Sequence, residues 1–283
     1  MDRSLPADLN DSVARALAED VGTGDLTAGL VPASARARAR VITRESAVLC
    51  GTHWVDAVFA QLDPAIRITW HAADGDTLAP DQLLLEAEGP ARGLLTGERT
   101  ALNFLQTLSG TATAARRYVE AIRDTGCTIL DTRKTIPGLR LAQKYAVRCG
   151  GGRNHRIGLF DGILIKENHI AACGSIGAAV AAARRLARQV PVEVEVESLE
   201  ELAEAFAADA DLALLDEFSL AELGIAVERN RARARPLGLE ASGGIELDTI
   251  RAVAATGVDF ISVGAITKHV RAVDLSMRLT VGR

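Results

Sequence analysis

The stretch VEVEVESLEELAEAFAADADLALLD, residues 192–216, contains two short apolar runs with a helical pattern between them. The runs 192–196 and 212–215 have the length and aliphatic content of buried strands. Between them, residues 199–208 carry apolar side chains at helical spacing. A strand, a helix and a second strand in so short a span predict a parallel βα unit.

The same alternation fills the chain after residue 126. The other apolar runs are Thr128–Leu130, Gly162–Ile165, Leu237–Leu239 and Phe260–Val263, and further helical patterns lie near 139–149, 174–189, 219–230 and 246–256. Repeated βα units of this kind predict a parallel α/β barrel. Six strands are fewer than the eight of a closed barrel, so we expect the barrel to be open or incomplete.

The first part of the chain has shorter and more varied patterns. Apolar side chains at helical spacing predict a helix that starts near Leu9 and ends at Gly22. Turn residues separate three β-rich stretches, at 38–44, 66–70 and 83–85. A further helical pattern lies at 54–62. These signals predict a small mixed sheet with a helix. A long helix is expected over 92–123, with an interruption at Gly110.

Charge, hydropathy and cysteine content exclude several classes of protein. The chain has 283 residues and a formal net charge of −5, which argues against a general nucleic-acid binder. No apolar run reaches the ~18–20 residues that span a bilayer, and the first residues lack the apolar segment of a secretory signal. The four cysteines are scattered and form no C-x-x-C pattern, which argues against a disulfide framework or a structural zinc. We therefore expect a cytoplasmic protein that binds neither nucleic acid nor membrane.

One segment of this acidic chain has an excess of positive charge. Residues 131–169 contain eight basic and three acidic residues, including three of the four lysines of the chain. The four lysines are Lys134, Lys144, Lys166 and Lys268. A solvated basic face would explain such a segment, but so would a site for a multiply anionic small molecule, and we favour the site. Lys144 lies on a predicted helix and receives no role.

Polar or glycine residues lie at the end of every apolar run in the predicted barrel. They are Asp131, Arg133 and Lys134 for the first run, Lys166 for the second, Glu195 for the third, Asp216 for the fourth, Ser242, Gly243 and Gly244 for the fifth, and Gly264 for the sixth. Active sites of α/β barrels are built at the carboxyl ends of the strands. We therefore expect these residues to form one site.

The carboxylates of this set suggest a metal. Glu193, Glu195 and Glu197 alternate with valines and so point the same way from their strand. Carboxylates inside a barrel are costly unless they are paired or bind a cation. Glu195 and Asp216 are candidate ligands for Mg²⁺, which takes one or two protein carboxylates together with substrate phosphates. Ion pairs between these glutamates and interior arginines remain the alternative.

The glycine-containing strand ends suggest an anion site. Backbone N–H groups can approach a phosphate closely where Ser242-Gly243-Gly244 and Gly264 follow the last two strands. Residues 149–156 likewise place three glycines before Arg153, His155 and Arg156. His155 is therefore a candidate ligand-binding residue. Lys166 at a strand end also leaves a Schiff-base aldolase open as an alternative.

Three motifs together resemble the quinolinate phosphoribosyltransferase family, the second structural type of phosphoribosyltransferase. They are Asp131-Thr132-Arg133-Lys134-Thr135-Ile136-Pro137-Gly138-Leu139-Arg140, the stretch from Gly150 to Arg156, and Lys166-Glu167-Asn168-His169. The order and spacing of Gly97-Glu98-Arg99-Thr100-Ala101-Leu102-Asn103, Glu193-Val194-Glu195-Val196-Glu197 and Val263-Gly264-Ala265 agree with it. The match covers nearly the whole chain.

The resemblance implies a fold and a reaction. It implies an α/β sandwich domain over residues 1–110, an open α/β barrel over 111–270, and a C-terminal segment, 271–283, that returns to the N-terminal domain. The reaction joins quinolinate to phosphoribosyl pyrophosphate (PRPP) and yields nicotinate mononucleotide, pyrophosphate and CO₂, a step of NAD biosynthesis. The resemblance also implies a Mg²⁺ requirement and a homodimer in which each site is completed by the neighbouring subunit.

The resemblance also implies a role for each matching residue. Arg133, His155, Arg156 and Lys166 hold the two quinolinate carboxylates, and Arg99 reaches them from the partner subunit. Lys134 lies between quinolinate and PRPP, and Glu195 and Asp216 serve Mg²⁺ and the ribose hydroxyls. Ser242, Gly243, Gly244 and Gly264 cradle the 5′-phosphate, while Lys268 and His269 reach the pyrophosphate. Asn168 and His169 support Lys166.

One position departs from the family pattern, and one related group needs separating. Glu217 stands after Asp216 where the family usually has asparagine, which places an extra acid near the proposed metal. Relatives associated with molybdenum transport share the barrel and the Arg-Lys-x-x-Pro-Gly pattern but lack the Lys-Glu-Asn-His motif that this chain keeps at 166–169. A degenerate barrel with a binding or transport-accessory role is the non-enzyme alternative. It is disfavoured because every polar site position is filled.

Overall fold

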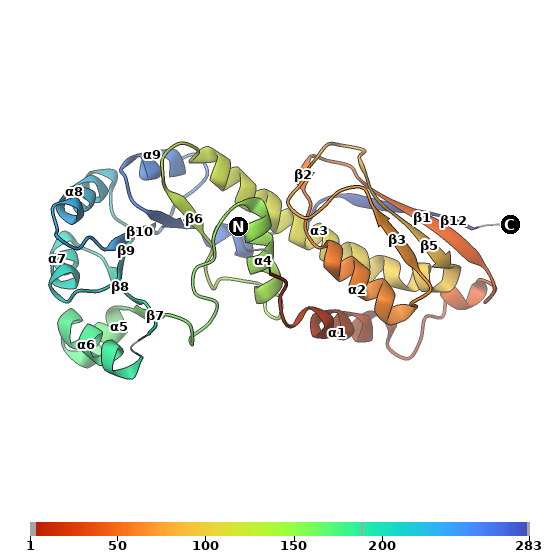
Figure 1. Ribbon diagram of the computed structural model, residues 1–283, viewed down its shortest axis with the longest axis horizontal. Coiled ribbons are helices and arrows are strands. Elements are labelled where there is room, and N and C mark those ends of the chain that lie inside the picture. The colour runs from red at the N-terminus through yellow and green to blue at the C-terminus, as the bar shows by residue number, and fades with distance from the viewer. Residues whose placement is uncertain (1–3, 188, 282–283) are drawn as a thin grey trace. The chain divides into compact units, whose positions relative to one another are not determined.

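The computed structural model describes residues 4–187 and 189–281 (Figure 1). Contacts between residues divide the chain into two compact units. Unit 1 comprises Met1–Arg116, Thr135–Gly151 and Ala265–Arg283, and unit 2 comprises Arg117–Lys134 and Gly152–Gly264. Within the described ranges, no helix is both long enough and apolar enough to cross a membrane.

Unit 1 is built on a four-stranded antiparallel sheet with the order β12-β1-β5-β3. Its strands are β1 (Arg36–Thr43), β3 (Arg67–Trp70), β5 (Leu83–Pro90) and β12 (Leu275–Val281), and β2 (Ala47–Val48) pairs separately with β4 (Thr77–Leu78). The remaining elements are α1 (Leu9–Val21), η1 (Ala28–Leu30), α2 (Thr52–Leu62), α3 (Ala91–Ala121), α4 (Arg140–Gly150) and α10 (Ala265–Lys268). The expectation of a mixed sheet was wrong, because every pairing in these two sheets is antiparallel.

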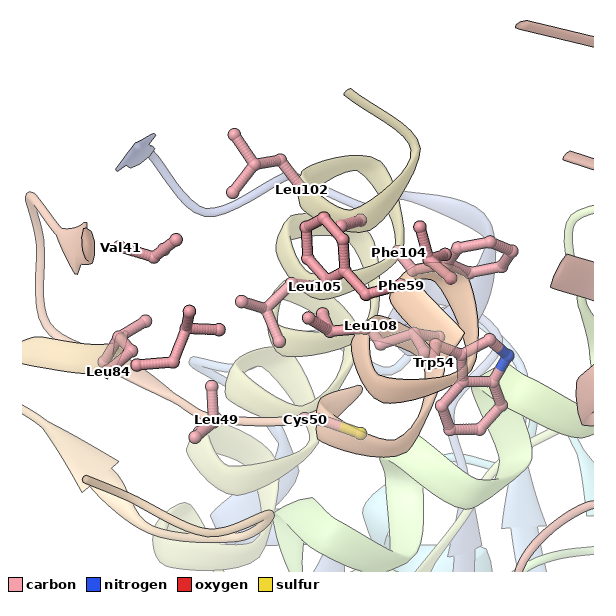
Figure 2. Close-up of a cluster of buried hydrophobic side chains, with 14 of the residues drawn as sticks. Val41, Leu49, Cys50, Trp54, Phe59, Leu84, Leu102, Phe104, Leu105 and Leu108 are labelled. Carbon is pink, nitrogen blue, oxygen red and sulfur yellow. The ribbon is translucent and has the colours of Figure 1, made fainter. Parts of the chain in front are cut away.

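The core of unit 1 follows from the alternation of its strands and the apolar faces of its helices. Along β1, alanine and valine side chains are buried while Arg36, Arg38 and Arg40 are exposed. Leucine, valine and aromatic side chains from strands and helices meet in one buried cluster (Figure 2). Trp54 of α2 is 0% exposed, and its indole Nε1 donates a hydrogen bond of 3.2 Å to Ser12 Oγ. Burial of so large a side chain makes α2 a major contributor to the stability of the unit.

Helix α3 is continuous over 31 residues, so the predicted interruption at Gly110 was wrong. A Cβ atom at position 110 would collide with the backbone carbonyl oxygen of Arg271. Nearby, the Val273 N–H donates a hydrogen bond of 3.1 Å to the Gln106 carbonyl. Glycine here therefore lets another part of the backbone approach the helix closely, and it does not end the helix.

Replacing Gly110 by alanine should destabilise the protein by about 1–3 kcal/mol, because the added methyl group overpacks against backbone that cannot rotate away. Urea unfolding followed by circular dichroism measures the change. Gly224 in α8 (Leu220–Arg231) is the matched control, because nothing lies within 4 Å of the Cβ that alanine would add there. Gly224→Ala should be neutral or stabilise the helix by up to about 1 kcal/mol. Equal losses of stability in the two variants would contradict the close-approach explanation.

Unit 2 is an α/β unit with a six-stranded parallel sheet in the order β6-β11-β10-β9-β8-β7, which confirms the predicted βα architecture (Figure 1). The strands are β6 (Thr128–Leu130), β7 (Ile163–Ile165), β8 (Val192–Val196), β9 (Leu212–Asp216), β10 (Gly238–Ser242) and β11 (Phe260–Ser262). The helices are α5 (Glu167–Cys173), α6 (Ile176–Leu186), α7 (Leu199–Ala207), α8 and α9 (Ile250–Ala255). Among the described residues, β6 and β7 are the edges of this sheet and do not pair with each other, so the barrel is open.

Two features of unit 2 differ from a regular series of βα units. Helix α4, expected as a barrel helix, contributes Ala142, Tyr145 and Cys149 to the core of unit 1. In the open part of the barrel, Arg153 instead forms a parallel β-bridge with Leu130 of β6. The loop that begins at Gly152 is thereby held along the edge of the sheet, where it brings the next residues towards the strand ends.

Candidate active site

Unit 2 contains a pocket of about 410 Å³ at the carboxyl ends of its strands. Eight of the residues predicted from the sequence line it: Arg133, Lys134, His155, Arg156, Lys166, Glu195, Asp216 and Ser242. Residues far apart in the chain meet here because parallel strands end at the same edge of the sheet. Glu240 and Ser262 also line the pocket and were not predicted.

Two arginines form the positively charged wall of the pocket. The Nε atom of Arg133 is buried and has no hydrogen-bond partner among the described residues. Burial lowers the pKa of the Arg156 guanidinium, and the nearby positive charge of Arg133 lowers it further, while Glu193 and Asp161 oppose the shift. Two partly buried guanidinium groups that repel each other would be stabilised by an anion placed between them.

Asp131 organises the loop that carries the second arginine. It is fully buried at the end of β6, and its carboxylate accepts hydrogen bonds from Asn154 Nδ2 at 2.6 Å and from the His155 N–H at 2.9 Å. These bonds fix the backbone just before Arg156. The sequence analysis noted Asp131 at the strand end but gave it no role. The signal was its place as the first polar residue after a buried run.

The ring of His155 has a defined tautomer. Its Nδ1 atom accepts a hydrogen bond of 2.8 Å from the Arg156 N–H, so Nδ1 carries no proton. The proton of the neutral ring is therefore on Nε2, which donates to Glu193 Oε2 at 2.8 Å. Glu193 thus meets an imidazole, and it also interacts electrostatically with the nearby Arg156 guanidinium group.

A second buried carboxylate lies beside this pair. Glu240 Oε2 is 3.5 Å from His155 Nε2, and Glu240 and Glu193 are 0% and 5% exposed. Burial raises the pKa of Glu240, and the neighbouring Glu193 charge raises it further. Glu240 sits two residues before Ser242 in an otherwise apolar run. That period-two spacing was the signal that could have placed it on the same face as Ser242.

Glu195 and Asp216 project from adjacent strands towards the same side. Glu195 of β8 is opposite Leu214 of β9, and Asp216 follows Leu214 by two residues. Side chains two residues apart on a strand share a face, so both carboxylates enter the pocket. Glu195 forms an ion pair with the Lys166 ammonium group.

The Lys166 backbone is fixed by the short helix that follows it. His169 Nδ1 accepts a hydrogen bond of 3.0 Å from the Lys166 N–H, and the His169 N–H donates to the Lys166 carbonyl at 2.8 Å. Asn168 instead donates to Glu167 at 3.5 Å. Helix α5 was not predicted, because it has seven residues and none of them is buried.

The glycines at the last two strand ends allow close contacts. Gly243 has a φ of 92°, and a Cβ there would lie 2.8 Å from the Glu217 backbone nitrogen and carboxyl group. Glu217 itself has a φ of 57°, and its N–H donates to the Ser242 carbonyl at 3.1 Å. A Cβ at Gly264 would lie 2.9 Å from Lys134 Cδ. Glycine at 243 and 264 therefore leaves room for Glu217 and Lys134.

Three predicted site residues belong to unit 1, whereas the pocket is in unit 2. Arg99 is exposed on α3. Lys268 is the last residue of α10, and both Lys268 and His269 are exposed. Their proposed contacts are therefore not part of the pocket described above.

Comparison with known proteins identifies the family. The sequence-family model for the quinolinate phosphoribosyl transferase N-terminal domain matches residues 25–109, and the family model for the C-terminal domain matches residues 111–278. The chain is 44% identical over 266 residues to the probable nicotinate-nucleotide pyrophosphorylase [carboxylating] of Bacillus subtilis, with 93% of this chain and 90% of that protein covered. It is 45% identical over 276 residues to the nicotinate-nucleotide pyrophosphorylase [carboxylating] of Mycobacterium leprae, with 95% and 96% covered.

Solved structures agree with this result. The nicotinate-nucleotide pyrophosphorylase of Francisella tularensis superposes with a TM-score of 0.92 at 50% identity over 98% of both chains. NadC of Streptococcus pyogenes superposes with a TM-score of 0.94 at 40% identity over 100% of both chains. Both family models and these similarities along nearly the full length show that the chain belongs to the quinolinate phosphoribosyltransferase family.

Proposed function

We propose that this chain makes nicotinate mononucleotide, pyrophosphate and CO₂ from quinolinate and PRPP, a step of NAD biosynthesis, in the pocket of unit 2. The function is that of its family, a family of phosphoribosyltransferases. The observation that carries the assignment to this pocket is the pair Arg133 and Arg156, two adjacent guanidinium groups with a lowered pKa at one and an orphan Nε at the other. Such a wall fits a dicarboxylate, because each carboxylate can accept paired hydrogen bonds from a guanidinium group.

The quinolinate half of the proposed site combines charge with a fixed neutral ring. Arg133, Arg156 and Lys166 supply the positive charges for the two carboxylates. His155 forms the wall beside them as a neutral Nε2–H tautomer. These positive charges would stabilise the bound quinolinate dianion. The buried Asp131 carboxylate holds the loop that presents His155 and Arg156.

The PRPP half of the proposed site contains the carboxylates and the glycine turns. Glu195 and Asp216 enter one pocket from adjacent strands with oxygen ligands of the kind that Mg²⁺ prefers, so these residues fit the metal. When bound, Mg²⁺ would neutralise charge on the pyrophosphate group. Lys134 is proposed to lie between the two substrates. Ser242, Gly243, Gly244 and Gly264 are proposed to cradle the 5′-phosphate, with Glu217 beside that turn.

The proposed mechanism needs no covalent nucleophile. The bond between C1 of the ribose and pyrophosphate loosens with oxocarbenium character, and the pyridine nitrogen of quinolinate attacks C1. Lys134 and the other basic groups stabilise charge on the departing pyrophosphate. Loss of the adjacent carboxylate as CO₂ then leaves an electron pair on the ring carbon, where the positive charge of the neighbouring nitrogen stabilises it.

We also propose a cytoplasmic homodimer in which Arg99 of one subunit completes the site of the other. Arg99 is exposed on unit 1, so its side chain is accessible for contact with a neighbouring subunit. Lys268 and His269 are proposed to bind the pyrophosphate group.

A stoichiometric assay tests the proposed function. Pure protein with quinolinate, PRPP and Mg²⁺ should release CO₂, pyrophosphate and nicotinate mononucleotide in equal amounts, and chelation of Mg²⁺ should abolish turnover. Nicotinate in place of quinolinate is the matched control and should give no product, because it lacks one of the two carboxylates that Arg133 and Arg156 are proposed to bind. Absence of product with quinolinate would contradict the proposal.

Mixing two inactive variants tests the shared site. Arg99→Ala and Arg133→Ala remove residues proposed to serve one site from two different subunits. If subunits exchange, half of the dimers are mixed and one of their two sites is intact, so activity should recover to about a quarter of wild type. No recovery after verified exchange would show that Arg99 serves its own chain.

A further inference from the structure

The interior of unit 2 holds a cluster of three titratable groups that the mechanism above does not use as acids. We call His155, Glu193 and Glu240 the acid cluster. His155 Nε2 is 2.8 Å from Glu193 Oε2 and 3.5 Å from Glu240 Oε2. Both carboxyl groups are buried, and Glu240 Oε1 has no hydrogen-bond partner among the described residues. A carboxylate buried in this way is costly unless it is protonated or paired with a cation.

Two pockets meet at the acid cluster. The active-site pocket is lined by His155 and Glu240 at the carboxyl ends of the strands. A second pocket of about 420 Å³ is lined by the same two residues, by Glu193, and by Leu212 and Phe260, the first residues of β9 and β11. This second pocket therefore reaches the cluster from the amino ends of the strands. The cluster has the substrate pocket on one side and a separate cavity on the other.

The surroundings of Glu240 favour its neutral form. Glu193 from β8 faces it with a negative charge, which raises the pKa of Glu240, whereas His155 and a hydrogen bond from Ser262 of β11 lower that pKa. The positive charge of Arg156 is directed towards Glu193 and Asp161. Burial and the Glu193 charge therefore hold the pKa of Glu240 above its ordinary range.

The proposed reaction requires a proton for the substrate carbon that loses CO₂. Loss of the 2-carboxylate breaks a C–C bond and leaves its electron pair on C2 of the pyridinium ring, and the product carries hydrogen there. We propose, resting on the function above, that Glu240 is the acid that protonates C2. The Glu240 O–H bond breaks, the C2–H bond forms, and Glu240 becomes a carboxylate. Water in the second pocket then returns a proton to it, while the product still fills the substrate side.

Other residues of the substrate pocket carry protons, but they are less suited to this step. The Lys166 ammonium group is paired with Glu195. Lys134 is the remaining ammonium group in the pocket lining. A carboxylic acid is a stronger acid than an ammonium group, and proton transfer to carbon is faster from a stronger acid. The choice between Glu240 and Lys134 can be tested.

Glu240→Gln keeps the size and hydrogen-bonding capacity of the side chain but removes the acidic proton. In a rapid-quench single turnover with quinolinate labelled in its 2-carboxyl group, pyrophosphate should appear within about threefold of the wild-type rate. CO₂ and nicotinate mononucleotide should appear about 10²-fold more slowly, because general acid catalysis contributes this order of magnitude and the unprotonated ring recaptures CO₂. The nucleotide that still carries both carboxylates should accumulate. Glu204→Gln, an exposed change on α7, is the matched control and should leave both rates unchanged.

The outcomes separate this proposal from the proposed function. If wild-type protein forms neither pyrophosphate nor CO₂, the proposed function fails. If wild type turns over and Glu240→Gln slows pyrophosphate and CO₂ equally, or slows neither, the role of Glu240 is overturned. If Lys134→Arg separates the two products and Glu240→Gln does not, Lys134 is the acid and the proposal is overturned.

The wild-type enzyme provides a second test that does not depend on folding of a variant. As the pH rises above neutrality, Glu240 loses its proton, so the single-turnover rate of CO₂ formation should fall while the rate of pyrophosphate formation holds. A constant ratio of the two rates across the range from pH 6 to about pH 10 would overturn the proposal.

Discussion

Arg133→Ala is expected to raise the Kd of quinolinate by about 10²-fold while changing the Kd of PRPP by less than about threefold. The guanidinium group lies in the pocket beside Arg156, and its buried Nε has no partner among the described residues. A bidentate bond to a carboxylate is therefore lost without a protein interaction to replace it. The repulsion that Arg133 exerts on Arg156 is also removed, so the change should not unfold the pocket.

Isothermal titration with each substrate measures this split. Arg229→Ala on the exposed side of α8 is the matched control, because it removes one positive charge far from the pocket lining. Both Kd values should stay at wild-type levels in that variant. Equal losses for quinolinate and PRPP in Arg133→Ala would refute a specific role in quinolinate binding.

Asp131→Ala should lower kcat/KM for quinolinate by about 10²-fold, although Asp131 is not proposed to touch a substrate. Its buried carboxylate accepts hydrogen bonds from Asn154 Nδ2 and the His155 N–H. Without it these donors lose their partner in the interior, and the loop that presents His155 and Arg156 is free to shift. A displacement of about 1 Å at catalytic groups costs rates of this order.

Hydrogen exchange distinguishes positioning from general unfolding. In Asp131→Ala the His155 amide should exchange faster, while amides of β8 and β9 should keep their protection. Asp248→Ala, an exposed change near α9, should alter neither exchange nor activity. Global loss of protection in the Asp131 variant would show that the carboxylate stabilises the whole unit and does not specifically place the loop.

The sequence predicted the elements of unit 2 well because each strand is a short, almost purely apolar run. The pattern at 192–216 reappears as β8, α7 and β9 with bounds that differ by a residue or two. Helix α5 carries no apolar stripe, so no periodicity revealed it. Its position depends on His169, whose ring holds the backbone of Lys166.

The site could be predicted less completely, for two physical reasons. Charged side chains stand out at the ends of apolar runs, so Arg133, Lys166, Glu195 and Asp216 could be predicted to lie near one another, and all four line the pocket. Glu240 lies inside a strand that is otherwise apolar, and only the fold brings it to His155. The unit that a helix joins also depends on long-range packing, and so α4 was expected in the barrel although Tyr145 packs beside Trp54 in unit 1.

The pairing of β12 with β1 has a consequence for the order in which the protein folds during synthesis. Thr43 pairs with Leu275, and Ala37 pairs with Val281, so one edge strand of the unit 1 sheet is translated only after all of unit 2. Residues of unit 2 are translated between these two strands and form parallel pairs among themselves. Contacts of such long sequence separation form slowly. Unit 2 should therefore complete its sheet first, and the edge of β1 should stay open to other strands until β12 has been translated.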